Sequence, residues 1–438
     1  MLGHGIASFT EGPWRAPAFN GTRRSVGIVV PGMPGPRHEP DARLNTAQAT
    51  ALPHSRFACP YRGRSANLAE TLDTLALLHE TETENRQIGA FLHMQAWKRD
   101  AIATAFGTES GHADFSESVP DALAHKGVML AWAARLTRDE EAQAPARFWR
   151  VEDGFIRSIG LGVNFAPAAS LALDPVGMHF DATRKSRLET ILRETDFNPA
   201  LLARASALRI AILRGNVTKY NLPGGSVHLP VGRDRQRILV VGQVEDDASV
   251  RFGAGRVRTN RDLLEAVRAA HPSAYIIWKP HPDVESGYRR GYVPASEAKR
   301  TADLVILSGN MSSLLGDVDA LHTMTSLAGF EALIRGVSVT CWGLPFYAGW
   351  GLTRDIETCA RRGRKLTLDE LVAGSLILYP RYQDPVTHLP CSPELLLERL
   401  SEPTLWPPLS RGRRTWLVWW KLQGRLIRQL RHWRMIQR

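Results

Sequence analysis

The chain has 438 residues, of which 44% are hydrophobic, and this is enough length and apolar content for two packed domains. Its four cysteines lie far apart without a CxxC pair, which argues against a zinc site or a disulfide framework and favours a reducing compartment. Nine Lys and Arg residues and no Asp or Glu lie between positions 411 and 438, so subtracting nine from the formal charge of +11 leaves a nearly neutral body. Nucleic acid is therefore disfavoured as a general partner.

The N-terminal region carries few signals of regular structure. Residues 1–20 have no basic stretch followed by an apolar one, and no later window approaches the roughly 20 apolar residues of a spanning helix. The sequence therefore predicts a cytoplasmic protein. Residues 1–60 are rich in Gly, Pro, Ala and Arg and are expected to be poorly ordered, with a strand only at Val26–Val30.

Residues 61–225 are expected to form a first α/β domain, because helical and strand-like apolar patterns alternate there. The predicted helical stretches are 67–106 and 184–213, the second interrupted at Asn198 and Pro199, and the predicted strands are 128–134 and 148–151. A linker rich in Pro and Gly follows at 222–232.

Residues 235–400 are expected to form a second, more regular domain. Five short apolar runs alternate with helices, a pattern that predicts a doubly wound parallel sheet whose ligand lies beyond the carboxyl ends of the strands. The predicted strands are 238–242, 275–279, 304–307, 320–323 and 337–342, and the predicted helices are 261–270, 294–300, 312–316 and 327–335.

Two loops at these carboxyl ends carry polar groups suited to a nucleotide phosphate. Lys279, His281 and Pro282 follow the second strand, in a loop that two prolines stiffen; an exposed histidine in a rigid turn is the alternative. Thr325 and Ser326 precede a helix, where a hydroxyl can cap the helix and free N–H groups can also bind an anion. A phosphate held in this way requires no metal, so no cofactor is expected.

A pair of acidic residues, Glu152 and Asp153, ends a predicted strand of the first domain and precedes Gly154. Adjacent strand residues point to opposite faces, so one carboxylate is expected to face the ligand, Asp153 first and Glu152 as the fallback. An acidic turn without chemistry is the alternative. An exposed carboxylate here would contribute little to folding. Arg157, after this turn, and Gln243, at the end of the first strand of the second domain, are further candidate substrate contacts.

Motifs of several other enzyme classes are missing from the sequence. No GxxxxGK[ST] loop, GxGxxG fingerprint or HExxH cluster occurs, which argues against ATPases, dinucleotide enzymes and metallohydrolases. The motifs present are VEDGFIRSIGLG from Val151, GQVEDDAS from Gly242, KPHPDV from Lys279, HTMTSLAGFEALIRG from His322 and PFYAGWGL from Pro345. In these motifs and their order, residues 125–390 resemble the KpsC-type capsule polysaccharide β-Kdo transferases. Well-known members carry two such modules in tandem, whereas this chain has room for one.

The resemblance implies a GT-B-like fold of two Rossmann-type domains facing a central cleft, related to bacterial CMP-sugar transferases such as sialyltransferases. It implies CMP-sugar binding in the C-terminal half and transfer of Kdo from CMP-Kdo, with retention, to a lipid-linked Kdo acceptor. The family's conserved groups map onto Glu152-Asp153-Gly154, His281-Pro282 and Thr325-Ser326.

The mechanism and the activity each have alternatives at this stage. Asp153 would be the nucleophile of a retaining reaction or the general base of an inverting one. Another CMP-sugar transferase, of sialyl type, would use the same motifs with a different sugar. A non-catalytic capsule-assembly scaffold at the membrane would keep the fold without turnover.

The segment 411–438 mixes Trp, Leu and Ile with its basic residues at the spacing of an amphipathic helix. Such a helix favours the interface of an anionic bilayer, where each basic residue adds on the order of 1 kcal/mol. We therefore expect peripheral association with the inner membrane, where a lipid-linked acceptor would lie. A terminal helix packed on the first domain is the alternative, and nucleic-acid binding is a third.

Overall fold

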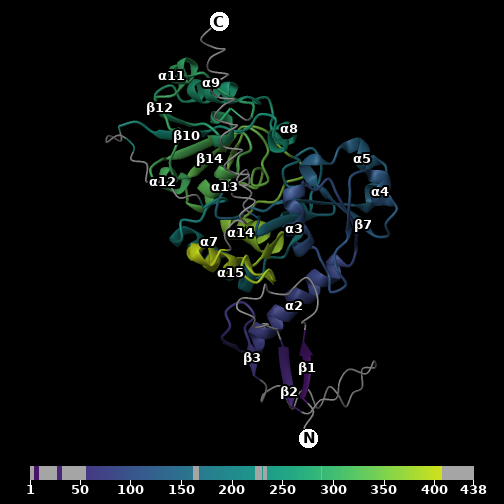
Figure 1. Ribbon diagram of the computed structural model, residues 1–438. Coiled ribbons are helices and arrows are strands. Elements are labelled where there is room, and N and C mark those ends of the chain that lie inside the picture. Colours follow the sequence, from purple (N-terminus) through teal and green to yellow (C-terminus); the bar gives the residue numbers. More distant parts are fainter. Residues whose placement is uncertain are drawn as a thin grey trace. The chain divides into compact units, whose positions relative to one another are not determined.

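The computed structural model describes residues 4–8, 27–31, 56–160, 167–221, 229, 234–287 and 289–406 (Figure 1). These residues form two compact units. The first unit holds the described residues up to Phe148 together with those from Arg381 onward, and the second unit is Trp149–Pro380. The units do not coincide with the predicted segments 61–225 and 235–400, because the acidic motif belongs to the second unit. Most of the predicted linker and the whole tail 411–438 lie outside the described residues.

Parallel strands form the centre of the first unit. Strand β5 (Ile88–Leu92) pairs with β6 (Asp114–Ser116) on one side and β7 (Val128–Trp132) on the other. Ala90, Leu92, Met129 and Ala131 of these strands are almost fully buried in one apolar cluster. The prediction of continuous helical structure over 67–106 is therefore wrong at β5, where a run of five residues is too short for periodicity to distinguish strand from buried helix.

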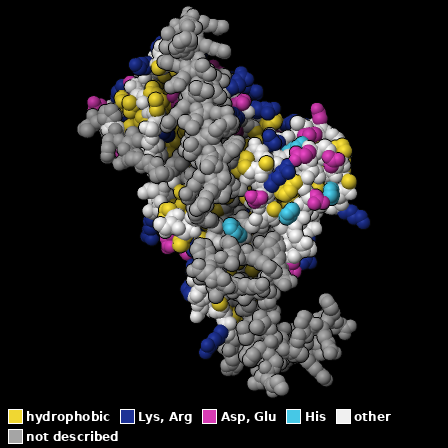
Figure 2. All heavy atoms as spheres, viewed as in Figure 1, with side chains coloured by type: hydrophobic (Ala, Val, Ile, Leu, Met, Phe, Trp, Pro, Cys, Tyr) yellow, Lys and Arg dark blue, Asp and Glu magenta, His cyan; other side chains and the backbone are white. Residues whose placement is uncertain are grey.

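Most of the described helices of the first unit begin at a side-chain cap. Helix α2 (Leu68–Asn85) is capped by Asn67 and α4 (Val119–Leu123) by Ser118, while α3 (Ala96–Ala105) has no side-chain cap. Helix α5 (Arg138–Ala142) has a complete capping box between Thr137 and Glu140. Its first turn also carries Asp139 and Glu141, and acidic side chains gather over α4 and α5 in Figure 2. Negative charge at this end opposes the positive end of the helix dipole and stabilises α5.

Short strands near the N-terminus correct the expectation for residues 1–60. Strand β2 (Gly27–Pro31) lies within one residue of the predicted strand, and it pairs in antiparallel register with β1 (His4–Ser8). Strand β1 was not predicted, so the expectation of only one strand in residues 1–60 is wrong, while the expected poor order of the segment stays a prediction. Strands β3 (Phe57–Ala58) and β4 (Ser65–Ala66) form a second antiparallel pair.

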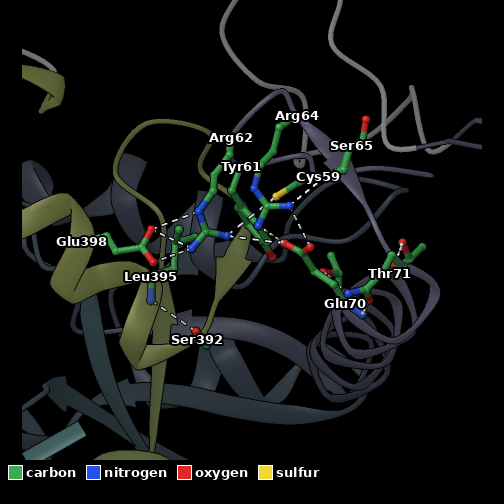
Figure 3. A network of polar contacts seen from close by, with 12 residues as sticks. Cys59, Tyr61, Arg62, Arg64, Ser65, Glu70, Thr71, Ser392, Leu395 and Glu398 are labelled. Carbon is green, nitrogen blue, oxygen red and sulfur yellow. Dashed lines mark hydrogen bonds and ion pairs between the residues drawn. The ribbon is translucent and has the colours of Figure 1, made fainter. Parts of the chain in front are cut away.

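The turn between β3 and β4 binds the end of the described chain through a polar network (Figure 3). Arg62 donates to Glu398 on α15 (Pro393–Ser401) at 2.6–3.0 Å, and Arg64 donates to Glu70 of α2. Deeper in the same region, Arg399 donates to Asp384 at 2.8 Å and to the carbonyl of Tyr61 at 2.6 Å. Since Asp384 is fully buried, the Arg399 pair is the energetically important one.

The second unit is built on a six-stranded sheet in which all neighbouring strands are parallel. Its spatial order is β12-β11-β10-β13-β14-β15. The strands are β10 (Arg237–Val241), β11 (Tyr275–Lys279), β12 (Leu304–Val305), β13 (Ala320–Thr323), β14 (Ser338–Cys341) and β15 (Arg354–Asp355). The five predicted strands and the doubly wound order are confirmed, and β15 is an addition. The chain runs outward from β10 in one direction and then from β13 in the other, so the topological switch point lies between these two strands.

Helices cover this sheet, and its central strands β10, β11 and β13 are buried almost throughout. The helices are α8 (Ala248–Gly253), α9 (Asn260–Ala270), α10 (Pro282–Glu285), α11 (Ala295–Thr301), α12 (Met311–Leu315) and α13 (Leu327–Ile334). Ile238, Val240, Ile276 and Trp278 pack with Leu263 of α9 in one buried cluster. Continuous apolar strands of this kind are typical of a parallel sheet between two helical layers.

The remaining part of the second unit carries the acidic motif. Strand β8 (Phe148–Asp153) pairs in antiparallel register with β9 (Ser170–Asp174). Two helices, α6 (Arg187–Glu194) and α7 (Pro199–Arg214), follow, and the predicted break at Asn198 and Pro199 is confirmed because Asn198 caps α7. Helix α14 (Leu368–Val372) continues into the π-helical turn η5 (Ala373–Leu378). The chain then returns to the first unit, where it forms β16 (Pro380–Gln383) and β17 (Pro390–Cys391).

Candidate functional site

Three polar loops meet at the carboxyl edge of the six-stranded sheet. They follow β10, β11 and β13, which are neighbours in the sheet, and they carry Gln243, His281 and Ser326. Loops on either side of a switch point diverge and leave a crevice where α/β proteins bind ligands. The sheet therefore brings together the residues that the sequence placed at separate strand ends.

Gln243 joins the loops after β10 and β13. Its Oε1 accepts hydrogen bonds from the N–H of Thr325 at 2.8 Å and from the hydroxyl of Thr323 at 3.1 Å. Its Nε2 donates to the hydroxyl of Thr325 at 2.9 Å. Both Gln243 and Thr325 are buried, and these hydrogen bonds, together with those between Gln243 and Asn260, fix the two loops in one arrangement.

His281 is held by its own helix in one tautomer. Its Nδ1 accepts a hydrogen bond from the N–H of Asp283 at 3.1 Å and caps α10, whose first residue is Pro282. A neutral ring that accepts at Nδ1 carries its proton at Nε2, so the distal nitrogen is a hydrogen-bond donor. Burial lowers the pKa of His281, against the opposing charges of Asp283 and Asp247, and the ring is therefore neutral at pH 7. A neutral N–H donor on a partly exposed ring is suited to a phosphate oxygen.

Lys279 and Ser326 lie at the carboxyl ends of β11 and β13, the two strands on either side of β10. Lys279 ends β11 and is 8% exposed, and burial lowers the pKa of its ammonium group. Ser326 caps α13, accepting from the N–H of Ala328 at 3.2 Å, and its carbonyl accepts from the hydroxyl of Tyr347. The N–H groups of the first turn of α13 point toward the same edge as the three loops, which makes that edge favourable for an anion.

Asp153 lies at the end of β8, opposite Leu171 of β9. Its Oδ2 accepts a hydrogen bond from Nε of Arg157 at 2.7 Å, and the side chain of Arg157 is 1% exposed while that of Asp153 is 19% exposed. Glu152 turns back on the strand, where its Oε1 accepts from the N–H of Asp153 at 3.2 Å. A side chain on the following Gly154 would collide with Ser170, which explains the glycine of the motif.

The loop 218–221 connects the acidic motif to α13. The carbonyl of Lys219 accepts from the N–H groups of Arg157 and Ser158 at 3.0 and 3.3 Å, and the N–H of Lys219 donates to Glu331 of α13 at 2.8 Å. The described backbone therefore links the Asp153 turn to the helix that Ser326 begins. Sequence reasoning missed Lys219, because it belongs to none of the motifs and only folding places it beside Arg157.

His179 is a second residue that the motifs did not indicate. Its ring lies edge-on to Phe155 at 4.8 Å between centroids, and its Nδ1 lies 3.4 Å from the hydroxyl of Tyr379. Tyr379 in turn donates to the buried Asp174 at 3.0 Å. Burial, with a smaller contribution from Lys219, lowers the pKa of His179 to about 3, so the ring is neutral. The Asp174, Tyr379 and His179 side chains form a polar support beneath the turn that follows Asp153.

Two further observations concern only the part of the chain that the structure describes. Within it, no three His, Cys, Asp or Glu side chains gather in a way that could hold a metal ion. No helix among the same residues is long and apolar enough to cross a membrane.

Comparisons with known proteins identify the family. A family model described as "Capsule polysaccharide biosynthesis protein" matches residues 225–382. The solved structure of KpsC from Thermosulfurimonas dismutans, titled as a β-Kdo 2,7 transferase, is 36% identical with a TM-score of 0.62, covering 73% of this chain and 99% of that one. This chain belongs to the KpsC-type capsule polysaccharide family. A second KpsC structure from that organism, titled as a β-Kdo 2,4 transferase, is also 36% identical, with a TM-score of 0.58, covering 66% of this chain and 91% of that one.

Other relatives in the KpsC-type family are capsule and lipopolysaccharide proteins. Capsule polysaccharide modification protein LipA of Neisseria meningitidis serogroup A is 41% identical over 360 residues, which are 80% of this chain and 51% of LipA. Lipopolysaccharide-processing protein LpsZ of Rhizobium meliloti is 40% identical over 320 residues, 68% of this chain and 71% of LpsZ. The chain thus spans about half the length of the LipA protein that it matches.

Proposed function

We propose that this chain is a glycosyltransferase that moves Kdo from CMP-Kdo to a lipid-linked Kdo acceptor during synthesis of the capsule polysaccharide linker. The observation that carries the proposal is the convergence of Gln243, His281 and Ser326 at the switch point of a parallel sheet in a chain related to Kdo transferases. A GT-B-like arrangement, with the six-stranded sheet on the donor side, belongs to the same proposal.

In this mechanism the donor phosphate binds at the carboxyl edge of the sheet. Nε2 of His281 donates to a phosphate oxygen, the ammonium of Lys279 supplies positive charge, and the hydroxyl of Ser326 and the first turn of α13 supply further donors. These donors stabilise the negative charge that develops on CMP as it leaves, without a metal cofactor. Gln243, Thr325 and Pro282 hold this set of groups in place.

The carboxylate of Asp153 acts as the nucleophile of a double displacement. Its oxygen attacks the anomeric carbon while the bond to the phosphate oxygen breaks and the electron pair leaves with CMP. The acceptor hydroxyl then attacks the same carbon, displaces Asp153 and gives its proton to a base, for which Glu152 is the adjacent carboxylate. Two inversions give net retention. Arg157 orients Asp153 through the 2.7 Å hydrogen bond.

The tail 411–438 lies outside the described residues, and membrane attachment is proposed from its sequence. Basic residues interspersed with Trp and Leu would place the chain on the anionic cytoplasmic face of the inner membrane. A lipid-linked acceptor is presented at that surface, so the tail would raise the local concentration of acceptor around the enzyme.

The test is mass spectrometry of a synthetic Kdo-lipid acceptor after incubation with purified chain and CMP-Kdo. A mass gain of one Kdo residue, undiminished in excess EDTA, is the expected result, and the anomeric configuration of the product by NMR decides retention. Transfer from CMP-sialic acid but not CMP-Kdo would instead establish the sialyl-type alternative. No transfer from either donor, by protein that binds neither, would overturn the proposal in favour of a scaffold.

A further inference from the structure

Lys219 is a cation that the mechanism above does not use, although the fold holds it between the two halves of the proposed site. Its carbonyl is bonded to the turn that follows Asp153, and its N–H is bonded to Glu331 of α13, as described above. The backbone carbonyl of the next residue, Tyr220, accepts a hydrogen bond from the N–H of Gly160 at 2.8 Å. Asn221 then adopts a left-handed backbone and donates to the carbonyl of Ser158 at 3.1 Å. The position of the Lys219 backbone is therefore defined by both neighbouring segments.

The charge of Lys219 acts on both parts of the site. Burial lowers the pKa of its ammonium, but the neighbouring Tyr220 and the carboxylate of Asp153 outweigh that effect and the pKa is raised, so the group is charged at neutral pH. The same charge contributes to lowering the pKa of His281. The backbone bonds of Lys219 to the turn after Asp153 and to α13 agree with this and place the residue beside both parts of the proposed site.

The chemistry of the donor requires positive charge at such a place. In a CMP-linked ulosonic acid the anomeric carbon carries both the phosphate oxygen and the sugar carboxylate. An anionic nucleophile that approaches this carbon is repelled by both groups. A cation between the nucleophile and the phosphate would offset the repulsion and would lie beside the carboxylate.

We propose that Lys219 binds the carboxylate of the donor sugar and thereby selects acidic sugars, an assignment that rests on the proposed function. Two other nearby cations are less suited to this role. Arg157 is fully buried and its Nε is bonded to Asp153, and Lys279 is almost completely buried at the end of β11. The side chain of Lys219 is partly exposed and its ammonium lies 5.3 Å from the ring centroid of Tyr220. The Tyr220 ring limits where the ammonium can move.

The experiment compares binding of CMP with binding of CMP-Kdo by titration calorimetry. Every protein in the comparison is the full chain with Asp153→Asn, which prevents turnover. One carries no further substitution, one also carries Lys219→Met, and one also carries Lys219→Arg. Arg235→Met is the control, because it also removes one positive charge but lies away from the proposed site. Arg235 pairs with Asp303 at the amino end of the six-stranded sheet. Circular dichroism melting of each variant establishes that it is folded.

The expected result is that Lys219→Met weakens CMP-Kdo binding about tenfold or more and leaves CMP binding within about twofold, because CMP lacks the carboxylate. Lys219→Arg should retain most of the preference for CMP-Kdo over CMP, and Arg235→Met should change neither affinity. Equal losses for both ligands, or no loss for either, would overturn the assignment of Lys219 alone. If the chain with Lys219 intact binds neither CMP nor CMP-Kdo, the proposed function fails and the assignment fails with it.

Discussion

Nε of Arg157 donates to Oδ2 of Asp153 at 2.7 Å, and this bond joins a fully buried guanidinium to a carboxylate that is 19% exposed. Asp153 is therefore partly buried rather than exposed, and we expect it to contribute more to folding than an exposed carboxylate would. Removing the carboxylate would leave the charge of Arg157 buried without its partner, which costs more than loss of the bond itself. The same pair holds Asp153 in one orientation, which a nucleophile needs.

Asp153→Asn should abolish sugar transfer while the chain stays folded, because the amide oxygen can still accept from Arg157 but cannot attack carbon. Asp153→Ala should also be inactive and should lower the free energy of unfolding by about 2 kcal/mol, less than for a fully buried pair. Product mass spectrometry and urea unfolding measure the two effects. Transfer by Asp153→Asn at the wild-type rate would exclude Asp153 as the nucleophile. If Glu152→Gln is inactive while Asp153→Asn is active, Glu152 is the nucleophile and Asp153 takes the other role.

His281→Asn separates the capping role of His281 from its proposed role toward phosphate. The Asn oxygen can still accept from the N–H of Asp283 and cap α10, but the distal N–H donor is lost. We expect CMP binding to weaken about tenfold in both His281→Asn and His281→Ala, with lower stability only in the alanine variant. Calorimetry with CMP is the measurement. An unchanged Kd in His281→Asn would place the phosphate elsewhere.

Gln243→Met should weaken CMP binding by loosening the loop that carries Ser326. The substitution keeps the volume but removes the acceptor of the Thr325 N–H, and a buried donor left unsatisfied costs about 1–3 kcal/mol. Urea unfolding gives the loss of stability, and CMP calorimetry gives the loss of affinity. If stability falls and affinity does not, the loop after β13 has no part in nucleotide binding.

Because His322 is buried, we expect the free energy of unfolding to depend on pH. Burial, together with the charges of His271 and Arg354, lowers the pKa of its imidazole to about 3 in the folded chain, whereas an unfolded histidine titrates near 6.5. Below pH 6.5 the unfolded chain binds the extra proton, so stability decreases as the pH falls from 6.5 toward 3. This histidine alone accounts for about 2 kcal/mol between pH 7 and pH 5.

The variant that tests this expectation is His322→Asn. In the native chain Nδ1 of His322 accepts a hydrogen bond from Nε1 of Trp342 at 3.2 Å, and the Asn side-chain oxygen can accept the same bond. Its free energy of unfolding should fall less steeply with acid than that of the wild type. His179 keeps part of the slope in both chains, since its pKa is also lowered to about 3. Parallel pH profiles for the two proteins would show that His322 is not buried as a neutral ring.

Truncation after Ser410 should abolish sedimentation with anionic liposomes at moderate salt and leave transfer to a soluble acceptor largely intact. Neutral liposomes are the control, because attraction of the basic tail depends on the charge of the lipid. A truncated chain that still sediments with anionic liposomes would place the membrane contact elsewhere. A truncated chain that unfolds would make the tail a structural element.

Sequence patterns predicted five strands of the six-stranded sheet because each of these five is a short, mainly apolar run followed by a polar loop, whereas β15 (Arg354–Asp355) has no apolar residue and was missed. Residues 275–279 and 320–323 match β11 and β13 without error. Strand β5 was missed because its five residues follow directly on the long helix α2. Strand β9 was missed because a single short run, Ser170–Asp174, has no helix on either side to mark it.

Some residues of the candidate site could also be predicted from local sequence patterns. Asp153, His281 and Ser326 sit in compact motifs that end strands or begin helices, so local sequence is enough to nominate them. The side-chain bonds of Gln243 to Thr325, and the backbone bond of Arg157 to Lys219, depend on residues distant in sequence. Lys219 reaches Arg157 only through backbone hydrogen bonds across some sixty positions, and no local pattern encodes such a contact.

The discontinuity of the first unit fixes an order for synthesis on the ribosome. Tyr61 and Arg62 emerge early, but their partners Arg399 and Glu398 are translated only after all of Trp149–Pro380. All the described residues of the second unit are available first, so it can complete its six-stranded sheet while the earlier-made strands of the first unit still lack their last segment. In nascent chains that stop near Pro380, the second unit should therefore resist proteolysis, whereas the first unit should be cleaved.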